Sequence, residues 1–301
     1  MVKTICLEEH FVAQAVKESQ SVTNLALHMF PEVVRNGLLE LGQPRVADMD
    51  RGGVSVQVIS HIPAFETPEV CRSANEQLSA SVKAYPTRYA GFACLPMGDP
   101  SAAAAELEHC VREYGFVGAL IPNHVQGTYY DSDDYLQFWQ KAVDLDIPIY
   151  LHPAPSSPGQ REYFKGNYLD ALAQIIGLFD KIPKLKVVIG HMGEMLPFMI
   201  ERAEVRMSSN WGSHKRTFTE VWNENFWITT SGMWYLAPMA CLLRSVAIDR
   251  ILYSIDYPLE EITLGGKFLD DLQKSGMVSQ HELEMIAYKN AESLLKIKVE
   301  I

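Results

Sequence analysis

Carboxylate and imidazole side chains stand at the end of an apolar run near the start of this chain. Ile5-Cys6-Leu7 leads directly into Glu8-Glu9-His10. Alternate side chains of a β-strand share a face, so Glu8 and His10 are predicted to point one way and Glu9 the other way. A glutamate and a histidine on one face would form half of a metal site. Read alone, the same residues also fit a solvated, acidic strand end.

Similar residues follow later apolar runs of the chain. The later strand ends carry His61, Asn123-His124, His152-Pro153, His191-Met192-Gly193-Glu194 and Asp256-Tyr257-Pro258. Five of the nine histidines stand at strand ends, and the other four are expected on helices or loops without a role in the site: His28, His109, His214 and His281. Each strand-end residue taken alone also fits a packing or capping role.

The apolar runs alternate with helical segments through the whole chain. The predicted strands are Thr4–Glu8, Ser55–Ser60, Tyr89–Leu95, Val117–Asn123, Pro148–His152, Lys186–His191, Trp227–Ser231 and Arg250–Asp256. Capped helices are predicted between them, for example from Asp99-Pro100 to Gly115. This alternation predicts a single-domain (β/α)₈ TIM barrel spanning residues 1–301. An open doubly wound sheet is the alternative, but no GxGxxG phosphate loop occurs.

One segment does not fit the repeat. Residues 23–51 are predicted to be an insertion after the first strand that covers the barrel mouth, the end at which the strands finish. In a TIM barrel the active site lies at that end. We therefore expect Glu8, His10, His152 and Asp256 to converge there as a mixed nitrogen and oxygen ligand set. Such a set suits Zn²⁺ or Mn²⁺, with Mg²⁺ as a further option, and its lack of thiolates argues against a structural zinc site.

Three further residues are candidates for chemistry at the same mouth. His191 and Glu194 are three positions apart and can touch, as expected of a general acid/base pair. Arg202 follows His191 by eleven residues, about three helical turns, and is predicted to bind an anionic substrate in its own subunit or a neighbour's. A surface arginine paired with Glu201 or Glu204 is the alternative for that position.

Composition limits the classes of partner. The chain has 26 Lys and Arg against 37 Asp and Glu, a formal net charge of −11, which argues against nucleic acid or an anionic membrane as partner. Its five cysteines are widely spaced and form no CxxC pair, which favours free thiols in a reducing compartment. No signal peptide and no membrane-spanning apolar run is visible. We expect a soluble, cytoplasmic protein.

Several motifs together resemble a known family. They are Glu8-x-His10, His152-Pro153, Gly190-His191-Met192-Gly193-Glu194 with Leu196-Pro197-Phe198, and Ser254-Ile255-Asp256-Tyr257-Pro258. This combination resembles the amidohydrolase-related decarboxylases, which include aminocarboxymuconate-semialdehyde decarboxylase. It is more similar to the γ-resorcylate and 2,3-dihydroxybenzoate decarboxylases, because Glu-x-His replaces the more usual His-x-His. The resemblance implies a distorted (β/α)₈ barrel, one divalent metal, no organic cofactor and a homodimer or homotetramer.

The resemblance also implies roles for individual residues. Glu8, His10, His152 and Asp256 would be the metal ligands. His191 and Glu194 would form the catalytic dyad, while Arg202 and Asn123 would contact the substrate. The implied reaction is the non-oxidative decarboxylation of an ortho-hydroxylated aromatic acid, with protonated Asp256 delivering a proton to the carbon that bears the carboxylate.

Two regions depart from the resorcylate-type pattern. Only 39 positions separate His152 from His191, so the segment 156–165 is expected to shape a different pocket, and residues 23–51 match no pattern of that group. Two other functions therefore stay open. One is a metal-dependent, lactonase-like hydrolase on the same barrel, because one fold serves many reactions. The other is a non-enzymatic ligand-binding protein with a relic site.

Overall fold

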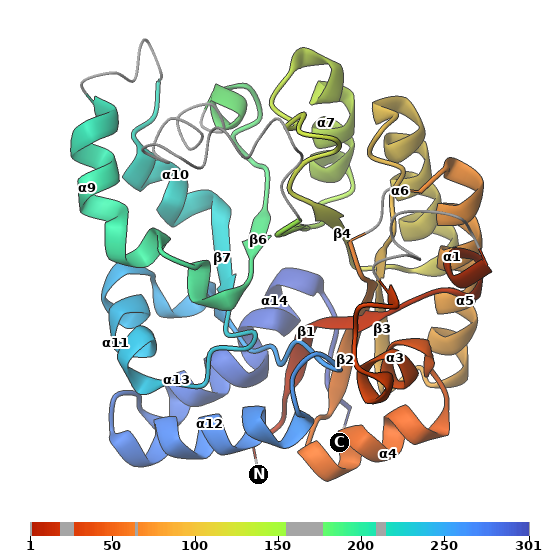
Figure 1. Cartoon of the computed structure of the whole chain (residues 1–301). Helices are drawn as coiled ribbons and strands as arrows, with labels where there is room; N and C mark the ends of the chain where they lie inside the picture. Colours follow the sequence, from red (N-terminus) through yellow and green to blue (C-terminus); the bar gives the residue numbers. More distant parts are fainter. Residues whose placement is uncertain (1, 19–26, 64–65, 155–176, 209–214, 301) are drawn as a thin grey trace.

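Eight parallel strands form the centre of the molecule. The computed structural model describes residues 2–18, 27–63, 66–154, 177–208 and 215–300 (Figure 1). The strands are β1 (Ile5–Phe11), β2 (Val56–His61), β3 (Tyr89–Ala93), β4 (Gly118–Pro122), β5 (Ile149–His152), β6 (Val187–Ile189), β7 (Phe226–Thr229) and β8 (Ile251–Leu252). They pair in chain order, and a parallel bridge between Leu7 and Ser254 joins the two edges. The predicted (β/α)₈ barrel is confirmed.

Helices surround this barrel (Figure 1). They are α1 (Gln14–Glu18), α3 (Glu32–Leu39), α4 (Gln43–Gly52), α5 (Pro68–Ala84), α6 (Pro100–Tyr114), α7 (Leu136–Asp144), α9 (Leu196–Ser208), α10 (Phe218–Asn225), α11 (Leu236–Ser245), α12 (Ile262–Ser275), α13 (Gln280–Glu284) and α14 (Asn290–Leu295). The described residues also form the 3₁₀ turns η1 (Asp133–Tyr135), η3 (His191–Gly193) and η4 (Ile248–Arg250) and the π-helical turn η5 (Met285–Lys289). Among the described residues, no helix is both long and apolar enough to cross a bilayer.

The predicted helix caps of α5 and α6 are present in the structure. The Thr67 hydroxyl caps α5 by accepting from the amide of Val70, and the Asp99 carboxylate caps α6. Gly115 ends α6 with φ +69°, a left-handed conformation that glycine adopts at little energetic cost. The helix predicted around residues 168–181 and the segment 156–165 lie largely or wholly outside the described residues.

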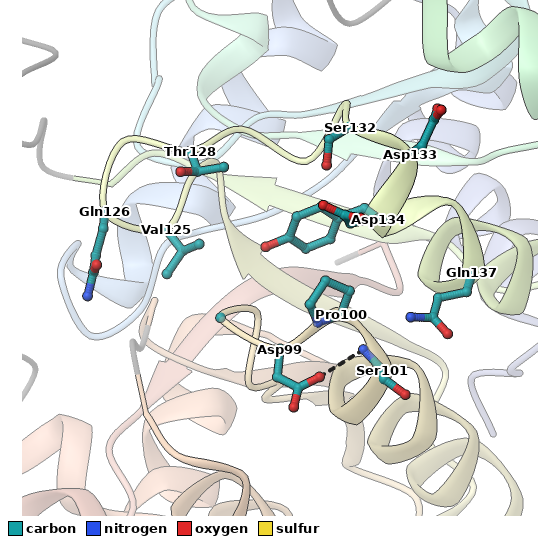
Figure 2. A pocket seen from close by; sticks show the side chains of 12 residues that line it. Asp99, Pro100, Ser101, Val125, Gln126, Thr128, Ser132, Asp133, Asp134 and Gln137 are labelled. Atoms are coloured by element: carbon teal, nitrogen blue, oxygen red, sulfur yellow. Dashed lines mark hydrogen bonds between the residues drawn. The ribbon is translucent and has the colours of Figure 1, made fainter.

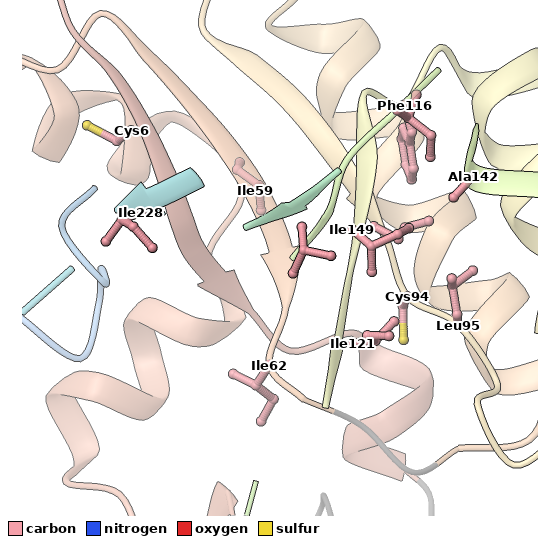
Figure 3. Packing of buried hydrophobic residues seen from close by; sticks show 14 of the residues in the cluster. Cys6, Ile59, Ile62, Cys94, Leu95, Phe116, Ile121, Ala142, Ile149 and Ile228 are labelled. Atoms are coloured by element: carbon pink, nitrogen blue, oxygen red, sulfur yellow. The ribbon is translucent and has the colours of Figure 1, made fainter. Parts of the chain in front are cut away.

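Two layers of apolar side chains hold the barrel together. Alternate residues of the strands fill its interior, among them Leu7, Val58, Phe92, Tyr150 and Val188, and α14 adds Leu294 and Leu295 to this cluster. The residues between them point outward and pack under the helices; Figure 3 shows Cys6, Ile59, Ile121, Ile149 and Ile228 of this outer layer. Strands buried on both faces explain why the runs read as almost continuously apolar.

The segment predicted as an insertion contains two described helices. α4 packs against α12, and it buries Arg45, Val46 and Met49 (Figure 1). It therefore takes the place of the outer helix that follows β1 in the repeat. α3 lies against the chain after β8, where a Cβ built on Gly37 would be 2.7 Å from the Cβ of Pro258. Residues 19–26 lie outside the described residues, so a covering role for that part stays a prediction.

Candidate active site

A bulge in β1 directs the first two predicted ligands into the barrel. The register passes from Cys6 opposite Gln57 to Glu9 opposite Ile59, so β1 holds one extra residue there. Leu7 already faces the interior, and strict alternation from it would send Glu8 outward. Glu8 instead has φ +62°, and beyond the bulge Glu8 and His10 share one side. The shared face is as predicted, but the bulge creates it.

The structure brings all four predicted ligands together, and His191 joins them. Oε1 of Glu8 lies 3.1 Å from Nε2 of His152 and 3.6 Å from Nε2 of His191. Nε2 of His10 lies 3.3 Å from Oδ1 of Asp256. Two overlapping groups, Glu8 with His152 and His191 and Glu8 with His10 and Asp256, each have their ligand atoms within 4.8 Å of one another.

The donor atoms of this cluster fit a divalent cation. Oε1 of Glu8, Nε2 of His10, Nε2 of His152 and Oδ1 of Asp256 are buried, and none makes a hydrogen bond of good geometry within the described residues. A buried polar atom without a partner costs about 1–3 kcal/mol, so four in one place indicate a group that satisfies them together. Imidazole nitrogen and carboxylate oxygen without thiolate suit Zn²⁺ or Mn²⁺.

The remaining ring nitrogens of two histidines are engaged away from the cluster. Nδ1 of His152 lies 2.7 Å from the carbonyl oxygen of Pro153, and Nδ1 of His10 lies 3.2 Å from Oγ of Ser60. A histidine that donates through one nitrogen presents the lone pair of the other, which is the arrangement of metal-binding histidines. We assign this tautomer from the hydrogen-bond partners.

The second oxygen of Glu8 is held by side chains from β5 and from the end of β7. The hydroxyls of Tyr150 and Ser231 both donate to Oε2, and the Thr229 hydroxyl lies 2.8 Å from the Tyr150 oxygen and 2.9 Å from the Ser231 oxygen. Burial and the neighbouring Glu8 raise the pKa of Tyr150, so this phenol stays protonated and remains a donor. These bonds orient Glu8 and leave Oε1 for a ligand. Gly190 packs against this carboxylate.

Opposite charges balance within the site. Burial alone would raise the pKa of Asp256, but the neighbouring imidazoles of His10 and His191 outweigh it and lower the pKa to about 2. Burial likewise opposes protonation of His191, yet Asp256 and Glu194 raise its pKa to about 10. Burial also works against ionisation of Glu8, whose pKa is nevertheless lowered because of His152. The carboxylates are therefore ionised at neutral pH, as metal ligands require.

The predicted dyad forms in a strained turn. Nδ1 of His191 lies 2.9 Å from Oε1 of Glu194, and Nε2 of His191 lies 3.8 Å from Oδ2 of Asp256. Glu8, His191, Glu194 and Asp256 all have positive φ, at 62°, 50°, 54° and 73°. A non-glycine residue in this region costs on the order of 1 kcal/mol or more, and such residues gather at functional sites. The strain supports a functional rather than a packing role for these residues.

The other predicted site residues lie at different distances from this cluster. Asn123 is exposed and lies beside His152. Its backbone amide donates to the backbone carbonyl of His152 at 2.9 Å, and its side-chain Oδ1 accepts from the backbone amide of Ala154 at 3.1 Å. Arg202 is exposed on α9, and no contact found among the described residues joins it to the cluster. His61 is bonded instead to Ala13, through Nε2 at 3.0 Å.

A hollow lies away from the barrel centre. It measures about 890 Å³ and lies between the loops that follow β3 and β4, near the start of α6 (Figure 2). Asp99, Gln126 and Asp134 line it, and Asp99 is engaged as the helix cap. None of the predicted site residues lines this pocket, so the chemistry is assigned to the cluster at the barrel mouth.

Comparison with known proteins identifies relatives of this chain. Residues 42–297 match the family model described as Amidohydrolase. The chain belongs to the amidohydrolase family. It is 42% identical to the decarboxylase orsB of Emericella nidulans over 97% of each chain. It is 34% identical to a gamma-resorcylate decarboxylase of Polaromonas sp. over 97% of this chain and 98% of that one.

A solved structure within this family shows the same fold. It is a dihydroxybenzoic acid decarboxylase from Polaromonas sp. with bound manganese and the inhibitor 2-nitroresorcinol; it matches with a TM-score of 0.85 and 32% identity over 98% of this chain and 97% of that one. The predicted resemblance to amidohydrolase-related decarboxylases is therefore confirmed. The predicted enzyme class, a carboxy-lyase, is confirmed as well, because the named relatives are decarboxylases.

Proposed function

We propose that this chain is a divalent-metal-dependent, non-oxidative decarboxylase of an ortho-hydroxylated aromatic acid. The observation that carries the proposal is that Glu8 shares one close group of ligand atoms with His152 and another with His10 and Asp256, and that these buried atoms lack hydrogen-bond partners among the described residues. The names of the relatives add the reaction class, since they include decarboxylases of resorcylate and dihydroxybenzoate.

Glu8, His10, His152 and Asp256 are the proposed metal ligands. Manganese is the proposed ion, with zinc as the alternative, because a structural relative holds manganese and the donor set accepts both. When bound, the cation would hold the substrate carboxylate and its ortho-oxygen and polarise the ring. The bonds to Glu8 from Tyr150 and Ser231 keep one ligand oxygen fixed in place.

Asp256 is the proposed proton donor to the ring. Asp256 is ionised in the free site and must first take up a proton. Its carboxyl group then transfers this proton to the carbon that bears the carboxylate, and this carbon then carries four single bonds. The bond to the carboxylate breaks, CO₂ leaves, and the electron pair returns to the ring, which becomes aromatic again. Asp256 ends as a carboxylate and must regain a proton before the next turnover.

His191 is the proposed source of that proton. Its Nε2 lies 3.8 Å from Oδ2 of Asp256, and its Nδ1 pairs with Glu194 at 2.9 Å. Glu194 is largely exposed, with 63% of its side chain accessible, so the dyad links the buried carboxylate to bulk water. A proton can therefore reach Asp256 along Glu194 and His191 without opening the barrel.

Arg202 and Asn123 are the proposed substrate contacts. Asn123 lies directly beside His152, while Arg202 lies on α9, which also exposes Phe198 and Val205. We propose that the chain forms a homodimer or homotetramer and that Arg202 reaches a substrate carboxylate in its own or a neighbouring subunit. Arg202→Ala should then raise KM for the acid more than it lowers kcat, whereas equal KM values would contradict the contact.

The proposal is tested by product analysis. Purified protein loaded with Mn²⁺ or Zn²⁺ is incubated with 2,6- and 2,3-dihydroxybenzoate and with a panel of lactones, and CO₂ release is compared with acid release. We expect CO₂ and the corresponding phenol from at least one hydroxybenzoate. Acid release from lactones without CO₂ would indicate a hydrolase instead. Failure to bind either metal would favour a relic site.

A further inference from the structure

A buried polar cluster lies on the outer side of the strand wall, directly behind the proposed metal centre. It consists of Glu9 on β1, Gln57 on β2 and Arg45 on α4, and each of these residues is 0% exposed. Alternation predicts only that Glu9 faces away from Glu8 and His10. The structure adds that Glu9 faces a guanidinium and an amide rather than solvent.

The three side chains form one hydrogen-bonded chain. Nε of Arg45 donates to Oε1 of Gln57 at 2.7 Å, and Nε2 of Gln57 donates to Oε2 of Glu9 at 3.1 Å. Oε1 of Glu9 then accepts from the backbone amide of Ile255 at 3.0 Å. The chain therefore runs from α4 across β2 and β1 to the residue that immediately precedes Asp256.

A second set of contacts from Arg45 reaches the other side of Asp256. Nη1 of Arg45 donates to the backbone carbonyl of His10 at 2.7 Å, and the guanidinium lies 4.9 Å from the centre of the Tyr257 ring. The amide of His10 in turn donates to the carbonyl of Tyr257 at 2.7 Å. Both neighbours of Asp256 and the backbone of His10 are thus held by this one cluster.

Stability alone does not account for this arrangement. Burying a guanidinium and a carboxyl group carries a desolvation cost, and apolar side chains of the same volume often stabilise a core equally well. Nη2 of Arg45 has no hydrogen-bond partner among the described residues, so the cluster is not fully satisfied. The bonds that leave the cluster have one feature in common. They contact the backbone of the two chain segments that carry His10 and Asp256.

We infer that Arg45, Gln57 and Glu9 are positioning residues that set the distance between the metal ligands His10 and Asp256 from outside the barrel. This inference rests on the proposed metal site. It gives a role to α4, which lies within the segment that matched no pattern in the sequence. Partners of metal ligands typically change metal affinity or activity 10- to 100-fold when they are altered.

The variants that test the inference preserve size and fold as far as the chain allows. Glu9→Gln keeps the shape of the side chain but replaces one acceptor oxygen with an NH₂ donor. This donor would face either the Nε2 donor of Gln57 or the amide donor of Ile255. Arg45→Lys keeps the charge but lacks the planar group that contacts Gln57 and His10 together. Each metal-free variant is first compared with the wild type by circular dichroism and urea denaturation. If Arg45→Lys does not fold, Glu9→Gln decides the result.

A second buried carboxylate provides a matched control. Glu106 is 4% exposed and accepts from Asn75 at 2.8 Å and from Arg72 at 2.6 Å, between α5 and α6. Glu106→Gln makes the same chemical change as Glu9→Gln in a comparable network that touches no proposed ligand. Both variants should lose stability, but only a change at Glu9 should reach the metal.

The measurement is Mn²⁺ affinity from the free-ion electron paramagnetic resonance signal, together with the visible spectrum of the Co²⁺-loaded protein. We expect a 10- to 100-fold higher Kd and a shifted Co²⁺ band in Glu9→Gln and Arg45→Lys, and a Kd within twofold of wild type in Glu106→Gln. Wild-type Kd and spectrum in both folded variants would overturn this inference alone. A wild type that binds neither ion would overturn the proposed function and this inference with it.

Discussion

Glu8 and His152 meet across the barrel, with 3.1 Å between Oε1 of the glutamate and Nε2 of the histidine. They come from β1 and β5, which are four strands apart in the sheet order. Only a closed barrel brings two such strand ends within bonding distance at one mouth. This contact therefore links the fold directly to the proposed chemistry, and it is the first one to test.

Removing either residue should lower metal content. Glu8→Gln keeps the size of the side chain but removes its negative charge, and His152→Ala removes one nitrogen ligand. We expect each purified variant to retain well under half of the wild-type Mn²⁺ or Zn²⁺ after dialysis, measured by plasma mass spectrometry. His109→Ala is the control, because His109 packs against Tyr114 on α6, and it should keep the wild-type content. Full occupancy in Glu8→Gln would contradict the ligand assignment.

Asp256→Asn should abolish turnover while the fold stays intact. The amide cannot deliver a proton. General acid catalysis typically contributes about 10²- to 10⁴-fold, so kcat should fall by at least about 100-fold. CO₂ release and circular dichroism are measured on the same preparation. Asp249→Asn, a change at a carboxylate with 62% side-chain exposure, should leave kcat unchanged. Wild-type turnover in Asp256→Asn would exclude the proton-donor role.

The strand order was predictable because its signals are local. Apolar runs such as Val56–Ile59 must be buried on both faces, and the caps at Thr67 and Asp99 depend on residues within one turn. The strand ends were less predictable. The predicted range of β8 is Arg250–Asp256, but the strand comprises only Ile251–Leu252, and beyond it the backbone amide of Ser254 donates to the Thr230 hydroxyl at 3.0 Å rather than to a backbone carbonyl of β7. That hydroxyl belongs to a different strand end, so the pairing depends on tertiary structure.

The proposed metal ligands were also predictable from the sequence, but the residues that hold those ligands in place were only partly predictable. Tyr150 stands two residues before His152 and therefore on the same face, a signal that alternation offers although no motif contains it. Ser231 and Gly190 carried no such signal, because their importance comes from where Glu8 lies. Arg45 is similar: nothing in its own segment indicates that its guanidinium reaches the backbone of His10. Such contacts between distant segments appear only in the folded chain.

Gly190→Ala should weaken metal binding through Glu8. A Cβ at this position would lie 2.8 Å from Oε2 of Glu8 and 2.8 Å from the Tyr150 oxygen, closer than these atoms tolerate. Overpacking of this kind costs roughly 1–3 kcal/mol, and here the carboxylate is what must move. We expect a Kd for Mn²⁺ raised about tenfold or more. Gly98→Ala is the matched control, because its Cβ meets nothing within 4 Å. Equal Kd values in the two variants would show that Glu8 is not displaced.

His61 should make the stability of the chain depend on pH below neutrality. Burial lowers its pKa from 6.5 to about 4, against the hydrogen bond to the carbonyl of Ile62. Because the folded pKa lies below the unfolded one, the stabilisation is present above pH 6.5 and is lost as the pH falls to about 4. The loss amounts to about 3 kcal/mol at most.

This loss is measured by urea denaturation of the metal-free protein between pH 7 and pH 4, with His61→Gln as the reference. In the wild type the backbone amide of Ala13 donates to Nε2 of His61 at 3.0 Å. The glutamine side chain can accept this hydrogen bond but does not titrate. The other acidic groups act in both proteins, so they cancel in the difference. The wild type should be the more stable protein at pH 7, and its advantage should shrink steadily toward pH 4. An advantage independent of pH would mean that His61 is not held neutral by the fold.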